Sequence, residues 1–499
     1  MVPSFKMRDK KWTAILLLLL VTLTAAATDG IQMRNCRPMA GSVPSYHHTA
    51  IPSYRHTAIP LYRHTAINSP LISKFSGDRR QLVVLVAFSD QDFQEESPLG
   101  LWNRIFNEEH YNVAPFYGSV HDYFYDQSYG QFRLAFDLHY IKLNESKIKY
   151  RSTSKDDENS KYLVCDLVDT LSLRGLDWSP YDWDDDGYID QLLIVYAGKG
   201  QNAGGGSSTI WPHQWWLSQH NGVEPRTVSS GGKDYLVDCY CCVQELSSRS
   251  DYGTFGTICH EYSHCFGFPD FYYGSASFLY SWDLMDYGNN NSDGFCPPNY
   301  SAHERWLMGW LTPEELTGPA TISDMASTAE ASQAYLIRND GYDDEYYMVE
   351  NRQPIGWDQS LSGSGLVVFH IDYDEQVWRE LMPNNGRDNH YTIIPANNLS
   401  MVSYCKGWAY PYGSNNQLTD DSQPSASLRH ANGNGAMLMS KPLTNITVTD
   451  GLASFDFMGG TAGISQHPTP GTRQPIILYN LGPIRIVRMP DGQIKKVFR

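Results

Sequence analysis

The chain of 499 residues carries 55 acidic and 38 basic side chains, which gives a net charge of −17 at neutral pH. This acidic balance argues against nucleic acid or an anionic membrane surface as the partner. Basic residues precede the apolar run 12–27, which ends in three alanines, so residues 1–27 are predicted to be a signal peptide. Because this run is short for a membrane span and no later stretch is as apolar, we expect a secreted protein, extracellular or attached to the cell surface, without a transmembrane segment after processing.

Residues 28–79 have the composition of a pro-segment or linker rather than of a core. Three copies of an eight-residue pattern, Tyr-X-His-Thr-Ala-Ile followed by two variable residues, fill positions 46–69. Three short, proline-interrupted copies cannot stack into a solenoid, so we interpret this stretch as a flexible linker.

From residue 80 onward, apolar runs alternate with helical patterns. The continuous apolar runs 81–88 and 191–197 are expected of strands buried on both faces. The spacing of apolar residues predicts helices at 101–108, 119–130 and 162–173 and an alternating strand at 131–138. Strands that alternate with helices predict an α+β catalytic domain over residues 80–315.

An acidic loop lies before the second buried run. Asp182, Asp184, Asp186 and Asp190 can direct carboxylate oxygens at one Ca²⁺ ion. The glutamate that closes an EF-hand loop is absent, since Leu193 takes its place, and a solvated acidic turn is the alternative. We favour calcium because this density of negative charge repels itself unless a cation neutralises it.

The pattern at residues 258–270 predicts a catalytic zinc site. His260 and His264 are four residues apart, so on a helix both imidazoles face the same side and can bind one metal ion. Glu261 then lies where a general base can take a proton from water that zinc has acidified.

A third ligand follows from the next residues. Gly267 allows a left-handed backbone that ends the helix, and Pro269 prevents the helix from resuming. The turn brings Asp270 back toward the metal. Three protein ligands leave a fourth position open, as a catalytic zinc requires.

The segment 281–288 resembles the Met-turn of the metzincin metallopeptidases. In that turn a methionine forms an apolar floor under the zinc, and Met285 matches it. Tyr287, two residues later, matches a tyrosine that approaches the metal or the developing oxyanion.

These marks together resemble the immune inhibitor A family of metzincin peptidases, and the resemblance covers about residues 80–460. Besides the zinc pattern and the acidic loop, its marks are the segments 87–90, 128–130, 210–213, 307–311, 350–352 and 365–372. The resemblance implies a metzincin-like fold, a zinc endopeptidase acting on protein or peptide substrates, bound calcium and synthesis as an inactive precursor.

The cysteines leave activation and pairing open. One hypothesis is that the thiolate of Cys36 holds the open zinc position until the pro-segment is removed, although its surroundings depart from the cysteine-switch motif; a disulfide or a free thiol is the alternative. Nine cysteines are an odd number, so at least one is unpaired within the chain. Plausible disulfide partners in an oxidising compartment are Cys239, Cys241, Cys242, Cys259, Cys265 and Cys296. A second metal site at the cluster 239–242 is an alternative that we rank below disulfides.

The C-terminal part reads as all-β. Short alternating runs separated by turn residues predict a β-sandwich-like domain over residues 316–460. Residues 461–499 are a linker and a tail with two strand-like runs, interpreted either as a signal recognised by an export machinery or as a terminal hairpin.

The sequence therefore predicts an exported zinc endopeptidase with Glu261 as general base. One rival within the enzymes is a different zinc-dependent hydrolysis, such as de-esterification. The rival from another class is a non-catalytic surface or adhesion protein that retains the metallopeptidase fold, and replacement of Glu261 would have favoured it.

Overall fold

A computed structural model describes residues 74–152, 159–220 and 222–460, together with the backbone of three strands at 476–481, 484–488 and 494–498. The predicted signal peptide, the repeats at 46–69 and Cys36 lie outside the described residues. Within the described part, no helix combines the length and apolar character that a membrane span requires.

The zinc motif lies beside a five-stranded sheet in the order β2-β1-β4-β8-β5. Its strands are β1 (Gly77–Ala87), β2 (Phe132–Lys142), β4 (Leu192–Lys199), β5 (His213–Trp216) and β8 (Cys239–Leu246). The first four strands in this order are parallel, and β5 pairs antiparallel with β8 at one edge. Both apolar runs predicted as doubly buried strands lie in the middle of the sheet, in β1 and β4.

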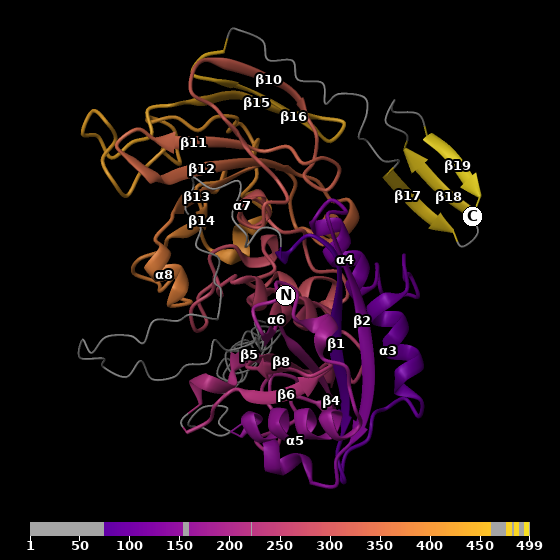
Figure 1. Ribbon diagram of the computed structural model, residues 1–499. Coiled ribbons are helices and arrows are strands. Elements are labelled where there is room, and N and C mark those ends of the chain that lie inside the picture. The colour runs from indigo at the N-terminus through magenta and orange to yellow at the C-terminus, as the bar shows by residue number, and fades with distance from the viewer. Residues whose placement is uncertain are drawn as a thin grey trace, which may run out of the picture. The chain divides into compact units, whose positions relative to one another are not determined.

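Helices cover both faces of this sheet (Figure 1). On one face are α3 (Pro98–Asn107), α4 (Val120–Gln127) and α6 (Phe255–Ser263), and on the other is α5 (Ser160–Leu173). Alternate residues of strand β1 pack against the helices on the two opposite faces of the sheet. Val83 and Leu85 pack toward α3, α4 and α6, whereas the alternate residues Leu82 and Val84 pack toward α5.

A small sheet in the order β3-β7-β6 carries the end of the acidic loop. Its strands are β3 (Tyr188–Ile189), β6 (Arg226–Ser230) and β7 (Lys233–Val237). The short parallel pairing of β3 with β7 places Lys233 next to the acidic loop.

Between α7 (Ala302–Leu307) and residue 460 the chain forms two further sheets. One has the order β14-β13-β12-β11-β9, and the other has the order β10-β16-β15. Their strands are β9 (Glu314–Glu315), β10 (Ala320–Met325), β11 (Tyr335–Asn339), β12 (Tyr342–Arg352), β13 (Gly365–Asp372), β14 (Tyr391–Ile393), β15 (Leu443–Thr449) and β16 (Leu452–Phe457), and the short helix α8 (Glu375–Arg379) lies between β13 and β14.

The larger of these two sheets contributes to two cores. On β13, Leu366 and Val368 pack with the three-stranded sheet, whereas Val367 and Phe369 pack into the core that also holds α6. One sheet thus joins the C-terminal strands to the layer that carries the zinc motif.

The last strands form a separate antiparallel sheet, β17 (Ile476–Leu481), β18 (Ile484–Arg488) and β19 (Ile494–Phe498). The first two strands are the strand-like runs expected from the sequence. The third strand was not predicted, because the charged residues of 494–498 obscure the alternation.

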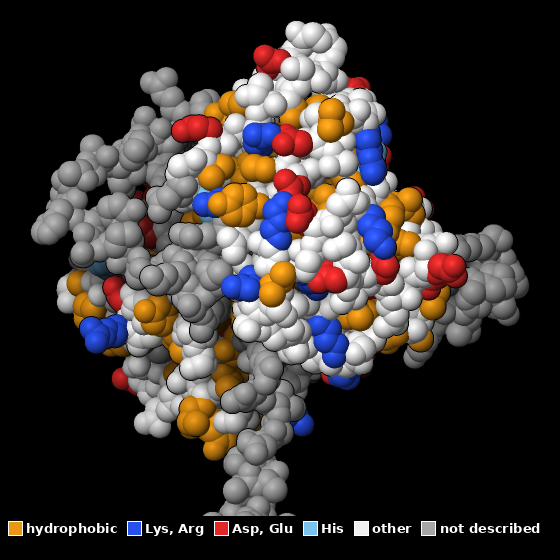
Figure 2. Space-filling view, turned by 90° about the horizontal axis from the view of Figure 1, so that it is seen from below, with side chains coloured by type: hydrophobic (Ala, Val, Ile, Leu, Met, Phe, Trp, Pro, Cys, Tyr) orange, Lys and Arg blue, Asp and Glu red, His pale blue; other side chains and the backbone are white. Residues whose placement is uncertain are grey.

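Acidic and basic side chains are interspersed on the face of the molecule seen in Figure 2. The net charge of −17 is therefore not gathered into a single acidic area on that face.

Candidate metal centre

Helix α6 carries the motif and is buried on every side. All nine of its residues, Phe255–Ser263, are buried, because the sheet lies on one side and the segment after the helix on the other. Gly256 permits the close approach of that segment, since a Cβ at this position would lie 1.9 Å from the carbonyl oxygen of Asn289. A glycine inside the helix costs about 1 kcal/mol relative to alanine, which the packing here must offset.

The end of the helix follows the prediction in its main feature. The α-helix stops at Ser263, one residue before the second histidine, and His264–Phe266 form a single tighter 3₁₀ turn. Gly267 then adopts a left-handed conformation with φ of 89° and turns the chain back.

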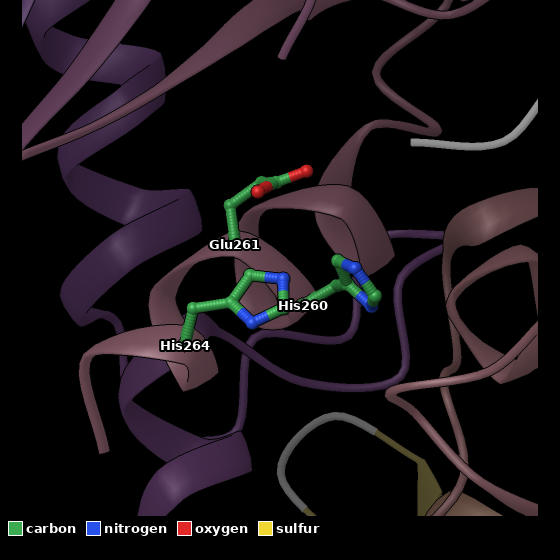
Figure 3. A group of neighbouring side chains, drawn as sticks. All are labelled: His260, Glu261 and His264. Carbon is green, nitrogen blue, oxygen red and sulfur yellow. The ribbon is translucent and has the colours of Figure 1, made fainter. Parts of the chain in front are cut away.

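This turn brings His260, His264 and Asp270 together. The Nε2 atoms of His260 and His264 lie 3.1 Å and 3.5 Å from Oδ1 of Asp270. Glu261 is part of the same cluster, because one ligand atom from each of His260, Glu261 and His264 lies within 4.8 Å of the others. Figure 3 shows the two imidazoles turned toward each other and the Glu261 side chain extending from the same turn of α6.

Backbone carbonyls orient both imidazoles. Nδ1 of His260 lies 2.9 Å from the carbonyl oxygen of Leu284, and Nδ1 of His264 lies 2.7 Å from that of Phe268. If each Nδ1 carries the proton and donates it to its carbonyl, each Nε2 presents a lone pair toward Asp270.

The cluster therefore has the donor set of a cation site. Nε2 of His260 and Oδ1 of Asp270 are buried and make no hydrogen bond of good geometry. Two imidazole nitrogens and a carboxylate oxygen that converge in a buried space are the ligands that Zn²⁺ prefers in catalytic sites. These residues fit a zinc ion.

The electrostatics of the cluster agree with this fit. Burial lowers the pKa of His260, but the Asp270 carboxylate outweighs burial and raises the pKa to about 9. Burial lowers the pKa of His264. One positive charge is thus stabilised among these groups, and a metal ion can supply it in place of a proton.

Comparison with known proteins shows which family this part of the chain is similar to. Residues 75–305 match the model of the immune inhibitor A peptidase M6 catalytic domain. These residues are thus similar to an M6 catalytic domain and are called the M6 domain below. M6 enzymes are metallopeptidases, so the family agrees with the donor set described above.

The curated proteins that this chain is similar to include the following two. Immune inhibitor A from Bacillus thuringiensis subsp. alesti is 26% identical over 329 residues, 53% of this chain and 47% of that protein. The pre-pro-metalloprotease PrtV from Vibrio cholerae serotype O1 is 26% identical over 201 residues, 33% of this chain and 21% of that protein. The chain thus spans less than half the length of these relatives.

Among solved structures, OgpA from Akkermansia muciniphila is 12% identical over 59% of this chain and 88% of that chain, with a TM-score of 0.24. A likeness at that TM-score supports no inference about fold or function.

Met285 and two tyrosines lie next to the predicted zinc ligands of the M6 domain. Met285 is fully buried, and its carbonyl oxygen accepts a hydrogen bond of 2.9 Å from the amide of Phe271, directly after Asp270. The ring of Tyr272 stacks on that of His260 with centroids 6.5 Å apart, and Tyr287 packs against Tyr272 at 5.7 Å.

Sequence reasoning missed Tyr272. Its only signal was its position two residues after the third predicted ligand, on the same turn as Asp270. Tyr287 keeps its proton at neutral pH, because burial and the nearby Asp286 raise its pKa to about 12. A protonated phenol can donate a hydrogen bond.

The structure gathers three of the four predicted calcium ligands in the M6 domain. Carboxylate oxygens of Asp182, Asp184 and Asp186 lie within 4.8 Å of one another. Asp190 is not part of this group of three; it forms a close ion pair with Lys74 and accepts a hydrogen bond of 2.5 Å from the amide of Trp183.

Two lysines already neutralise part of this loop. Nζ of Lys74 lies 3.4 Å from Asp184, and Nζ of Lys233 lies 3.0 Å from Asp182. These two lysines come from distant parts of the chain, so side-chain cations as well as a bound metal ion can hold the carboxylates of the loop together.

Proposed function

We propose that this protein is an exported zinc endopeptidase that hydrolyses peptide bonds in proteins, with His260, His264 and Asp270 as the zinc ligands. The observation that carries the proposal is the convergence of both Nε2 atoms on Oδ1 of Asp270, at 3.1 Å and 3.5 Å, inside an M6 domain. When bound, zinc polarises the scissile carbonyl and lowers the pKa of water.

Glu261 is the general base in this proposal. Its side chain is buried and belongs to the ligand cluster, so its carboxylate is within reach of a proton at the metal centre. It takes the proton from the attacking water and returns it to the leaving amine. Tyr287 donates to the oxyanion, Tyr272 holds the ring of His260, and Met285 is the apolar floor of the site.

Further parts of the proposal concern the rest of the chain. The fold is of the metzincin type, with residues 316–460 as a β-sandwich-like domain. Calcium binds Asp182, Asp184 and Asp186. Cys36 in the pro-segment keeps the enzyme latent, the protein acts outside the cell, and the C-terminal tail is recognised during export.

Cleavage of an unfolded protein substrate tests the central proposal. We expect the processed wild type to cut it, and Glu261→Gln to lose at least about a hundredfold in kcat while it still binds one zinc ion, because the base is lost but not the ligands. A chelator should abolish cleavage and added zinc should restore it. Glu109→Gln, at an exposed position after α3, is the matched control and should cut normally.

A different outcome would favour the non-catalytic alternative. If the processed wild type binds one zinc ion per chain yet cuts neither protein nor ester substrates, the protein is better described as a surface or adhesion protein with a metallopeptidase fold. Cleavage of an ester alone would instead favour the other zinc-dependent hydrolysis.

A further inference from the structure

Two thiols lie close together directly beside the zinc motif. Cys239 is the first residue of β8, and Cys265 follows His264 in the turn after α6. Their Sγ atoms are 3.9 Å apart, although the residues are 26 positions apart in the sequence. Both side chains are half-buried, so a small oxidant can reach them.

The fold brings this pair together. Strand β8 and helix α6 are consecutive and pack against each other, so the chain runs out along the strand and returns along the helix. The end of the helix is therefore next to the start of the strand. The amide of Gln214 on β5 donates to Cys239 Sγ at 3.3 Å, which holds this thiol at the sheet edge.

We propose that Cys239 and Cys265 form a disulfide bond in the exported protein. A disulfide needs the sulfurs about 2.05 Å apart, so the pair must close by about 2 Å, within the reach of rotation about the two Cα–Cβ bonds. In the reaction both thiols lose their protons, one S–S bond forms, and an external disulfide such as oxidised glutathione is reduced to two thiols.

The bond would close a covalent ring around the zinc motif. The ring contains β8, the connection to α6 and all of α6, and thus His260, Glu261 and His264. A cross-link of this kind stabilises mainly by restricting the unfolded chain. Because Cys265 is bonded directly to His264, the bond also holds the second predicted ligand against the sheet. We expect reduction to lower Tm by several degrees and to speed loss of zinc to a chelator several-fold.

Peptide mapping of the full chain tests the proposal. The protein is made in an oxidising compartment in the Glu261→Gln background, which excludes self-digestion, and is then equilibrated with oxidised glutathione. Free thiols are blocked with a maleimide before tryptic digestion and mass spectrometry without reductant. We expect a Cys239–Cys265 linked peptide that disappears in Cys239→Ser and in Cys265→Ser.

Cys405→Ser is the matched control, because Cys405 is a buried thiol that contacts Ser362 in another part of the fold. This variant should keep the link. Maleimide on both Cys239 and Cys265, or a link from either to another cysteine such as Cys36 or Cys241, would overturn the proposal.

Metal analysis separates the disulfide from a thiol metal site. We expect the same zinc content, one ion per chain, before and after reduction. A second zinc ion bound only by the reduced protein and lost in Cys239→Ser would overturn the proposal, since the thiols would then be metal ligands. Neither test uses peptidase activity, so failure here is distinct from failure of the proposed function.

Discussion

Gly267 is the residue on which the position of Asp270, the third proposed ligand, depends. Its φ of 89° is in the left-handed region, and the turn it forms directs Asp270 to the two histidines. A side chain in this conformation costs about 1–2 kcal/mol. Gly267→Ala should therefore lower the free energy of unfolding by about that amount and weaken zinc binding, measured by thermal unfolding and chelator competition.

Gly175→Ala provides the matched control for this change. Gly175 follows α5, has φ of 74°, and has open space around the position of a Cβ. The backbone cost should be similar, but no predicted ligand depends on the turn. If Gly267→Ala binds zinc as tightly as the wild type, the turn does not set the position of Asp270.

The buried position of His220 leads us to predict that the stability of the fold depends on pH. His220 is buried, lies 2.9 Å from the hydroxyl of Tyr240, and has a pKa that burial lowers to about 4. The unfolded chain binds this proton at about pH 6.5 and the folded chain only near pH 4, so stability falls as the pH decreases between these values, by at most about 3 kcal/mol.

His220→Gln should flatten this part of the profile, because glutamine can keep a hydrogen bond to Tyr240 but does not titrate. Tm measured from pH 7.5 to pH 4 checks this. The same change at the exposed His110 is the control. An unchanged slope in His220→Gln would place the acid sensitivity elsewhere.

At the scale of elements, the segment before β1 belongs to the folded unit. Phe75 is buried, its ring lies 5.1 Å from that of Phe266, and its carbonyl oxygen accepts a 2.9 Å hydrogen bond from the indole of Trp310. The sequence placed the start of the fold near residue 80. Lys74 and Phe75 carry no periodic signal, and their ring and ion-pair partners on other elements lie 57 or more positions away, so the prediction could not include them.

Substitution of Lys74 tests how much the segment before β1 contributes to the stability of the fold. The Lys74 side chain and that of Asp190 are only 15% and 4% exposed, so loss of the lysine leaves a buried carboxylate without its cation. Lys74→Met should lower the free energy of unfolding by about 3–5 kcal/mol, measured by urea unfolding in the presence of a chelator. Calcium should recover part of this loss if the loop binds it.

Lys233→Met is the matched control on the same loop. Lys233 pairs with Asp182 but is 47% exposed, so its loss should cost less than about 1 kcal/mol. Equal effects of the two changes would show that burial of Lys74 does not matter. If calcium changes the free energy of unfolding of neither variant, the lysines alone are the cations that neutralise the loop.

At the scale of the whole molecule, features set by residues close in the sequence could be predicted, whereas contacts between distant residues could not. The zinc pattern was predictable because its residues lie within eleven positions, so one helix and one turn decide their geometry. The segment 350–352 was noted only as a mark of the family. The structure explains it: Arg352 is buried between Glu350 and Asp358, and Glu350 accepts a hydrogen bond from the amide of Ala302 at the start of α7.

The five-stranded sheet β14-β13-β12-β11-β9 therefore supports the layer that carries α6 and the zinc motif. Met348 on β12 and Phe369 on β13 share a core with Met285 and α6. Removing this sheet would expose that core to water at a cost of about 25 cal/mol for each Å² of apolar surface. We predict that a chain of residues 74–311 does not fold, whereas residues 74–460 fold and bind zinc.

Urea unfolding and zinc analysis of the two truncated chains check this prediction. The longer chain should unfold in one cooperative transition with one zinc ion bound, because α6 and the sheet share a core. The shorter chain should show no cooperative transition and bind a dye for exposed apolar surface. Cooperative unfolding of the shorter chain with zinc bound would mean that the M6 domain is stable alone, so that the sheet serves another purpose, such as positioning the substrate.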